Sequence, residues 1–264
     1  MKESAGAASR GKSRTPARQA TPAVKSEAGP GTNRRNEIKA IVARRFAEFG
    51  FDSTTTREIA QDAKMLSGSI YYHFLTKEDM LHEIIREPLL KLRDNTTRIS
   101  EENYDAEHKI ITIFFLSLQE MTGNDQHAYA ILYNERKLLR RRAEFSYVPE
   151  ARSVMYHAWR TVLREGIDAG LFRQGTDSFL TITTIVRMLN TCVDWFRDSD
   201  AVSAERRHHS FQEVVDFNLD FILSAIRNRA RIDEPIPHAK CEQLARAAVT
   251  AARSKVGSRP RKVK

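Results

Sequence analysis

The sequence predicts an all-α protein, with a small group of helices at the front and a larger helical domain behind it. Apolar residues recur at three- and four-residue steps from residue 33 to residue 229. No stretch shows sustained strand alternation, and 11 Gly and 8 Pro in 264 residues are too few for a turn-rich β fold. A hydrophobic fraction of 41% is enough for a core, so we expect helices packed on helices.

The first helices form a head over residues 33–82. In the first of them, a stripe of apolar residues ends at Gly50. The second begins at Thr55, because Glu58 three residues later completes a capping box. A four-residue turn then leads to a third helix within MLSGSIYYHF, residues 65–74. The second and third helices therefore have helix-turn-helix spacing.

The larger domain spans residues 83–229. Its first helix begins in the head, where Thr76 and Asp79 form a second, weaker capping box, and Pro88 is expected to kink this helix without ending it. Five further helices are predicted, at about 106–122, 126–146, 150–169, 177–197 and 204–229.

The two ends of the chain differ from its middle. Residues 1–32 are rich in Ala, Ser, Thr, Gly and Pro and predict a disordered basic arm. Residues 230–264 predict a basic tail, with a short helix at 239–253. Residues 1–35 carry eight Lys or Arg against two acids, and residues 230–264 carry nine against three. Such ends either bind phosphates or are solvated segments that aid solubility.

The third helix carries residue types that suit contact with DNA. In a helix-turn-helix this helix places its first turn in the major groove. Small residues there let the backbone approach the duplex, and their hydroxyls can donate or accept a hydrogen bond. Tyr and His can donate to phosphates. Plainer roles remain open, with Tyr71 in core packing, His73 in local hydrogen bonding and Lys77 as a solvated charge.

The stretch FAEFGFDSTTTREIAQDAKMLSGSIYYHFLTKEDMLHEII, residues 46–85, resembles the DNA-binding domain of TetR-family transcriptional regulators. The shared pattern is Phe-Ala-x-x-Gly-Phe/Tyr, Thr-x-x-Arg-x-Ile-Ala, Gly-x-x-Tyr-x-His-Phe and Lys-Glu-x-Leu/Met, and the match extends over residues 33–95. The resemblance implies base contacts from Ser67, Gly68, Ser69 and Tyr71, and phosphate contacts from Thr55, Arg57, Tyr72, His73 and Lys77.

Two residues depart from the family pattern. Lys64 stands at the end of the second helix, where the family usually has Gly, so we expect a strained or differently shaped turn. Leu66 occupies a position that is commonly polar. An apolar side chain there would limit the hydrogen bonds by which the protein reads bases directly.

The same resemblance implies that the larger domain binds a ligand and forms a homodimer through its last two long helices. Residues 177–197 are apolar on nearly every face, and residues 211–226 have a similarly wide apolar surface. Two such helices carry more apolar surface than one small helical bundle needs for its core. A four-helix interface between two copies would cover the excess.

Four residues of the larger domain are candidate ligand contacts. Arg187 and Asn190 interrupt the apolar helix, and a buried Arg needs a partner, which is either an anionic ligand or Asp194 across the dimer. Trp159 and Trp195 either line a cavity or fill the core.

A second similarity concerns the effector. The segments MLSGSIYYHFLTKEDMLHEII, GLF and MLN with a following Trp are similar to TetR regulators of fatty-acid and ketosteroid breakdown in actinobacteria. This similarity implies an acyl-CoA thioester as effector. The run ERKLLRRR, residues 135–142, would then meet the phosphates of that ligand, unless it is only a solvated basic face.

These observations predict a homodimeric regulator that a small molecule releases from a palindromic operator in double-stranded DNA. A repressor is expected, with half-sites about 34–36 Å apart. The alternative is a ligand-independent architectural DNA-binding protein. An enzyme is not expected, because the sequence has no metal-spaced His/Cys/Asp/Glu cluster and no Gly-rich phosphate loop. No metal or cofactor is therefore predicted.

The expected location is the cytoplasm, at the nucleoid. The two cysteines, Cys192 and Cys241, match no metal or redox spacing, and no secretory leader is present. The longest apolar run is too short to span a bilayer, so no membrane partner is expected.

Overall fold

The computed structural model describes residues 30–194, 209–231 and 233–257 of the chain. Within these ranges the chain forms helices and no β-strand, and the one strand-like pairing is an isolated bridge between Phe172 and Arg227. The predicted all-α fold is confirmed. Among the helices in these ranges, none is both long enough and apolar enough to cross a membrane.

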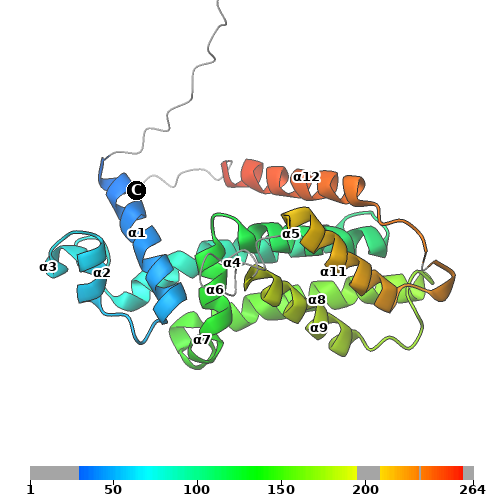
Figure 1. The fold of residues 1–264 in the computed structure, drawn as a ribbon, viewed down its shortest axis with the longest axis horizontal. Helices are drawn as coiled ribbons and strands as arrows, with labels where there is room; N and C mark the ends of the chain where they lie inside the picture. Colours follow the sequence, from blue (N-terminus) through cyan, green and yellow to red (C-terminus); the bar gives the residue numbers. More distant parts are fainter. Residues whose placement is uncertain (1–29, 195–208, 232, 258–264) are drawn as a thin grey trace, which may run out of the picture.

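Figure 1 shows a head at one end of an elongated helical domain. The head contains α1 (Pro30–Phe49), α2 (Thr56–Asp62) and α3 (Ser67–Ile70), and α4 (Lys77–Glu101) runs from the head into the larger domain. The larger domain continues with α5 (Ala106–Thr122), α6 (Gln126–Asn134), α7 (Arg136–Arg141), the 3-10 turn η1 (Ala143–Phe145), α8 (Tyr147–Asp168), α9 (Ser178–Asp194), α11 (Phe211–Ile226), the 3-10 turn η2 (Arg229–Arg231) and α12 (His238–Gly257).

The core of the head is continuous with part of the larger domain. One buried apolar cluster begins with Phe46 of α1 and Ile70 of α3, passes along α4, and reaches α6, α7 and the start of α8. A second cluster fills the far end around α5. The head is therefore packed against α6 and is not a separate body on a linker, so a shift of α6 acts directly on α1.

Local capping signals fix where the helices of the head begin. The predicted capping boxes are both present, with Thr55 and Glu58 at α2 and Thr76 and Asp79 at α4. A third, formed by Ser210 and Glu213, starts α11. Helix α4 continues through Pro88, as predicted.

The turn after α2 is strained, as the sequence predicts. Lys64 has φ +54°, in the left-handed region that a side chain disfavours, and it is the only non-glycine residue with positive φ among those described. The turn keeps this conformation because Met65 N donates to Ala60 O at 2.9 Å. Gly at this position would avoid the clash with a Cβ atom.

Several predicted boundaries are wrong. Helix α1 begins at Pro30, three residues early, because Pro fits the first turn of a helix. The long helix predicted at 126–146 is broken into α6, α7 and η1, since Glu135 has φ −90° and ψ 22°, and Arg142 is extended with φ −94° and ψ 123°. Helix α11 begins at Phe211, and residues 204–208 of the predicted helix lie outside the described residues.

Candidate DNA-binding head and effector cavity

The tip of α3 is exposed on the surface of the head. Ser67, Gly68, Tyr71 and Tyr72 are exposed, and the Tyr72 side chain is 90% accessible. Ser69 and His73 are partly buried. Leu66, just before the helix, is 80% accessible. Large apolar and aromatic side chains are thus exposed to solvent and do not pack in the core of the chain.

Gly68 has no structural role within the chain. A Cβ atom built at this position would have no atom within 4 Å, and its φ is not in the left-handed region. Gly inside a helix costs about 0.5–1 kcal/mol relative to Ala. A glycine that the fold does not require is consistent with close approach of an external surface.

Two of the residues expected to contact phosphates have bonds within the head. Thr55 Oγ1 accepts from Glu58 N at 3.3 Å, as the cap of α2. Lys77 Nζ donates to Phe51 O at 2.8 Å and to Thr54 O at 3.0 Å. Lys77 therefore holds the loop between α1 and α2, and two of its three N–H donors are used there. Arg57 is exposed.

That same loop is held from the other side by the segment after α6. Phe51 N donates to Glu135 Oε1 at 2.8 Å. Arg142 Nη1 lies 2.8 Å from Glu78 Oε1, and its guanidinium stacks over the Phe51 ring at 5.3 Å. We call Glu135 and Arg142 with these contacts the head clasp. The hydrogen bond from Arg142 holds the pKa of Glu78 below its usual value.

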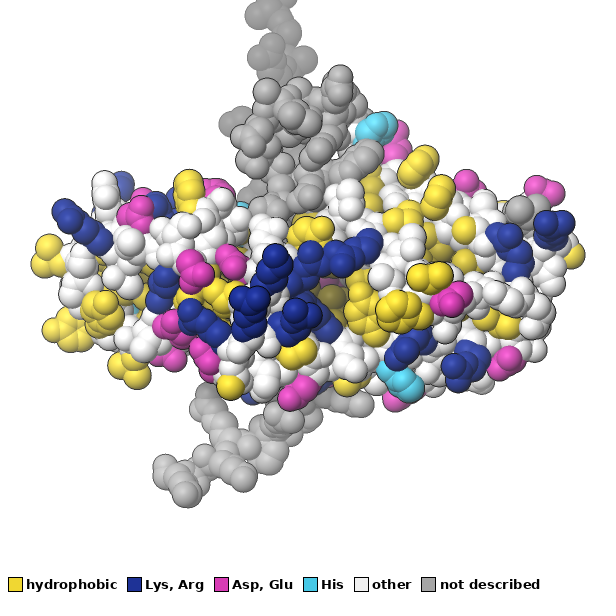
Figure 2. Space-filling view, turned by 90° about the horizontal axis from the view of Figure 1, so that it is seen from below, with side chains coloured by type: hydrophobic (Ala, Val, Ile, Leu, Met, Phe, Trp, Pro, Cys, Tyr) yellow, Lys and Arg dark blue, Asp and Glu magenta, His cyan; other side chains and the backbone are white. Residues whose placement is uncertain are grey.

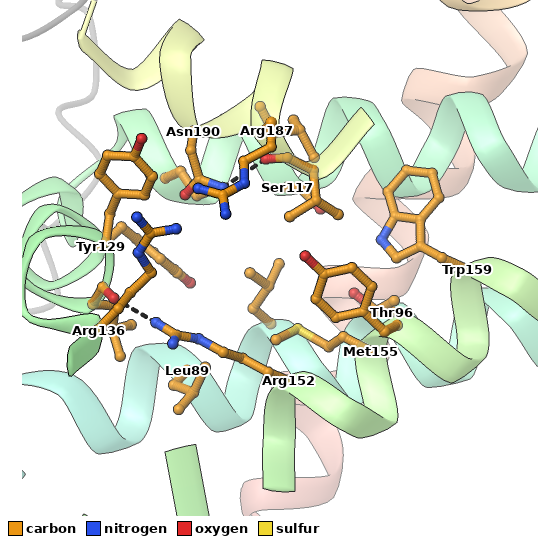
Figure 3. Close-up of a pocket in the computed structure, with 17 residues that line it drawn as sticks. Leu89, Thr96, Ser117, Tyr129, Arg136, Arg152, Met155, Trp159, Arg187 and Asn190 are labelled. Carbon is orange, nitrogen blue, oxygen red and sulfur yellow. Dashed lines mark hydrogen bonds between the residues drawn. The ribbon is translucent and has the colours of Figure 1, made fainter. Parts of the chain in front are cut away.

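Between α4, α5, α6, α8 and α9 lies a cavity of about 190 Å³ (Figure 3). Its walls are largely apolar, with contributions from Leu89, Met121, Met155 and Trp159. Tyrosine side chains of α6 and α8 also reach it. An apolar cavity with a few polar groups is the usual form of a small-molecule site.

Three guanidinium groups line this cavity, from Arg136 of α7, Arg152 of α8 and Arg187 of α9 (Figure 3). Arg152 donates to Leu132 O, and Arg136 lies 4.7 Å above the Tyr133 ring. Among the side chains that the structure describes, which do not include that of Asp194, no carboxylate lies within ion-pair distance of any of the three. Burial, and then the charge of Arg136, lowers the pKa of Arg152 from its usual value.

Uncompensated positive charge beside apolar walls favours an anionic ligand, because a carboxylate or phosphate would satisfy these donors with charge-assisted hydrogen bonds. Figure 2 shows that Lys and Arg side chains gather around a hollow on the face seen from below in Figure 1.

The structure brings together three of the four predicted ligand residues. Trp159, Arg187 and Asn190 all line the cavity, and Trp195 lies outside the described residues. Arg187 is exposed in the single chain, and its burial between two copies stays a prediction. Asn190 Nδ2 donates to Val186 O at 2.6 Å. Trp159 is 3% accessible, so it fills the core and lines the cavity at once.

Sequence reasoning missed Arg152, and it placed Arg136 only within the basic run 135–142. No spacing pattern relates arginines on α7, α8 and α9, because they meet only after the helices pack. The signal that could have found Arg152 is its position on the inner side of an amphipathic helix, among Val148, Met155 and Trp159.

Helices α9 and α11 expose large apolar side chains in the single chain. Phe217 and Phe221 are 69% and 56% accessible, and they lie one turn apart on α11. Phe179 and Leu180 of α9 are each 63% accessible. The opposite side of α11 is buried against the core, so the helix is apolar on two sides, which is typical of an interface.

Comparisons with known proteins show what the chain resembles. Residues 43–84 match the family described as bacterial regulatory proteins, tetR family. Residues 105–215 match the tetracyclin repressor-like C-terminal domain. The HTH-type transcriptional repressor KstR2 of Mycobacterium tuberculosis is 30% identical over 189 residues, which cover 71% of this chain and 94% of KstR2. KstR2 of Rhodococcus jostii is 30% identical over 195 residues, covering 74% and 95%.

Solved structures show the same resemblance. The structure of the ketosteroid transcriptional regulator KstR2 of Mycobacterium tuberculosis superposes with a TM-score of 0.66 at 29% identity, covering 74% of this chain and 96% of that one. AibR, in complex with isovaleryl coenzyme A and operator DNA, superposes with a TM-score of 0.59 at 16% identity, covering 73% and 99%. The second likeness shows the fold alone.

Proposed function

Since the chain belongs to the TetR family of bacterial transcriptional regulators, we propose that it is a homodimeric repressor which an acyl-CoA thioester releases from its operator. The resemblances to this family and to its ketosteroid branch are confirmed. Regulators of this family bind operator DNA, usually as homodimers, and respond to small molecules. Its relatives are regulators, not enzymes. One observation carries the effector proposal, namely three arginines around an apolar cavity that have no carboxylate partner among the described side chains.

The exposed tip of α3 supports the proposed docking on DNA. We place residues 67–73 in the major groove, with Ser67, Gly68, Ser69 and Tyr71 facing bases. Phosphate contacts would come from Arg57, Tyr72 and His73. Thr55 and Lys77 would contribute with the hydrogen-bonding capacity that their bonds inside the head leave free. Exposed Leu66 would meet a thymine methyl group. We propose the cytoplasm, at the nucleoid, as its location, because a regulator docked in this way works on chromosomal DNA.

Changing Gly68 to Leu separates DNA contact from folding. We expect an unchanged or higher melting temperature, because the site is open and Leu favours helix. Operator affinity should fall at least tenfold, about 1.4 kcal/mol, because the new side chain keeps the backbone from the bases. Thermal unfolding and fluorescence anisotropy with an operator duplex measure the two effects. Ser153→Leu on α8 is the control, and equal affinity of both variants would contradict the docking.

The cavity and its rim fit the two parts of an acyl-CoA. An acyl group suits the apolar walls, and the nucleotide would extend outward past the rim. Arg136 and Arg187, both exposed, and the basic run 135–142 would meet its phosphates. AibR has the same fold and has been seen with isovaleryl coenzyme A, so the fold can accommodate this class. An architectural DNA-binding protein would have no use for such a cavity.

Titration of the protein–operator complex tests the effector class. Isovaleryl-, octanoyl- and palmitoyl-CoA are compared with free CoA and with the free acids, and native mass spectrometry identifies any ligand kept by the purified dimer. We expect an acyl-CoA to release the operator at a concentration at least tenfold below free CoA or free acid. Arg152→Met should raise the required concentration at least tenfold, because a desolvated charge-assisted contact is lost.

The same titration has a control and a failing outcome. Arg164→Met, an exposed arginine elsewhere on α8, should respond as wild type does. Release by free acids alone, or release that Arg152→Met does not affect, would contradict the acyl-CoA assignment.

The structure also supports a route from cavity to head. Glu135 of the head clasp is followed directly by Arg136 at the cavity rim. A ligand that draws Arg136 to its phosphates would shift Glu135 away from Phe51 N. The ligand then favours the state in which the clasp is open, and it changes operator affinity by its difference in affinity for the two states.

A further inference from the structure

Two adjacent arginines of α1 hold the segment that carries α3. Arg34 Nη2 donates to Ala63 O at 2.5 Å, and Arg35 Nη1 donates to His73 O at 2.6 Å. Ala63 precedes α3 and His73 follows it. We call Arg34 and Arg35 with these two hydrogen bonds the α3 brace. Through the α3 brace, both ends of the segment are tied to one turn of α1.

Helix α3 is too short to hold its own orientation. It has four residues, and its N-cap, Leu66, makes no side-chain hydrogen bond. A single helical turn is not stable alone. Ile70 and Phe74 are 0% and 3% accessible and attach the segment to the core. Apolar burial is non-directional, whereas hydrogen bonds are directional, so the two arginine bonds fix the tilt of α3 relative to α1.

The Arg34 bond acts on the strained turn before α3. Ala63 is the C-cap of α2, and Lys64, the next residue, has φ +54°. Carbonyl groups at a helix C-terminus lack intrahelical partners, and a cation beside them is favourable. Arg34 Nη1 also lies 2.8 Å from Glu37 Oε2, one turn along α1. The guanidinium is therefore held between its own helix and the turn.

The Arg35 guanidinium contacts three different groups. Besides His73 O, it pairs with the carboxylate of Glu83 on α4, where Nε lies 3.2 Å from Oε1. Its Cζ atom lies 4.4 Å from the centroid of the Phe74 ring. These contacts use the planar fork of an arginine, which the single ammonium group of a lysine does not reproduce. Both arginines of the α3 brace are partly exposed, so direct contact with phosphates is the rival role that a test must separate.

Helix α1 is a fixed support for the α3 brace. Ile38, Val42 and Phe46 are each 0% accessible along its inner face. The same helix packs on α6 of the larger domain. The tilt of α3 is therefore set by a helix that is anchored in the core, and not by the four residues of α3 themselves.

We propose that Arg34 and Arg35 are positioning residues, which fix the tilt at which α3 presents its first turn to the bases of a half-site. The inference rests on the proposed function, because that function places α3 in the major groove. Sequence is read by hydrogen bonds to base edges, whereas phosphate contacts carry no sequence information. A wrong tilt therefore reduces the preference for the operator and leaves non-specific binding in place.

The test keeps the charge of the α3 brace and removes its geometry. The full-length variant carries Arg34→Lys and Arg35→Lys, and Lys still binds phosphates as a point charge. The matched control carries Arg44→Lys and Arg164→Lys, two exposed arginines of α1 and α8. The operator is the palindrome that wild-type protein selects from random duplexes, and the reference is a scrambled duplex of equal composition. Anisotropy at several salt concentrations gives both affinities, and thermal unfolding shows whether each variant is folded.

We expect the ratio of operator affinity to scrambled affinity to fall at least about tenfold in the double variant, because two hydrogen bonds from charged donors are disrupted. Affinity for the scrambled duplex, and its slope against log salt, should match wild type, since the charge is unchanged. The control should keep the wild-type ratio. An unchanged ratio in the double variant, an equal loss on both duplexes, or an equal fall of the ratio in the control would overturn the α3 brace.

Glu83→Ala is a second test, for which the rival role predicts the opposite sign. The variant removes one partner of Arg35, and Ala favours the helix in which it lies. If the α3 brace positions α3, operator affinity should fall at least about threefold while scrambled affinity does not fall. If Arg35 binds a phosphate, its release should raise operator affinity. Unchanged or higher operator affinity would therefore overturn the proposal.

The two tests stay decisive if one protein does not fold. Should the double variant be unfolded, Arg34→Lys alone and Glu83→Ala are measured in its place, with the same expected fall in the ratio. Failure of the proposed function is distinguishable, because wild-type protein would then select no palindrome and would bind all duplexes equally, whatever the variants do.

Discussion

Replacement of Phe217 and Phe221 by Glu should give a monomer that binds the full operator at least 100-fold more weakly. Both rings are exposed on α11 in the single chain. Covering a large apolar side chain contributes about 1.5–3 kcal/mol. In a twofold interface both copies carry the two substitutions, so carboxylates replace apolar contacts from each subunit. Loss of bivalent binding reduces affinity by about 10²–10⁴.

Sedimentation velocity and anisotropy with full and half operators measure the change. Affinity for a half-site should stay close to wild type, because the head is not altered. Val154→Glu and Tyr104→Glu are matched controls on α8 and on the segment before α5, and they should remain dimeric. A dimeric double variant would show that the copies meet through another face.

Glu135→Ala is expected to abolish most of the response to effector. The variant removes the acceptor of Phe51 N–H, which is the contact that joins the cavity rim to the loop between α1 and α2. The ratio of operator dissociation constants with and without the active acyl-CoA should fall at least tenfold toward 1. This corresponds to about 1.4 kcal/mol of coupling free energy, within the usual range for allosteric sites.

The ratio is informative because any change in operator affinity that is the same with and without the acyl-CoA cancels in it. Binding of the acyl-CoA itself, followed by calorimetry, should be nearly unchanged, since Glu135 is not among the residues that line the cavity. Glu150→Ala is the control, because Glu150 is an exposed acid in the first turn of α8 and is not part of the head clasp. A variant that binds acyl-CoA and still releases the operator normally would rule out this route.

Prediction from sequence was strongest where the signal is local. The starts of α2 and α4 follow from a Thr and an acid three residues apart, and both capping boxes form. The strained turn at Lys64 follows from the missing Gly. The boundaries of α5 were predicted to the residue. In each case the decisive atoms lie within a few residues of one another.

The broken helix at 126–146 shows where local signals end. Its residues favour one continuous helix, and nothing in their spacing marks Glu135 as a break. The Glu135 carboxylate accepts from Phe51 N, 84 residues away in the chain. A contact between distant segments therefore overrides local helix propensity, and it places the head clasp beside the cavity.

The amino-acid sequence by itself determined the helical class, the helix-turn-helix head and its family, because periodicity, caps and motif spacing are properties of short segments. Only the tertiary structure decided which charges meet. Arg136, Arg152 and Arg187 converge from three helices on one cavity, and the buried Arg227 pairs with Glu107. Those encounters depend on how whole helices pack, and so the candidate effector site could be recognised only in the folded chain.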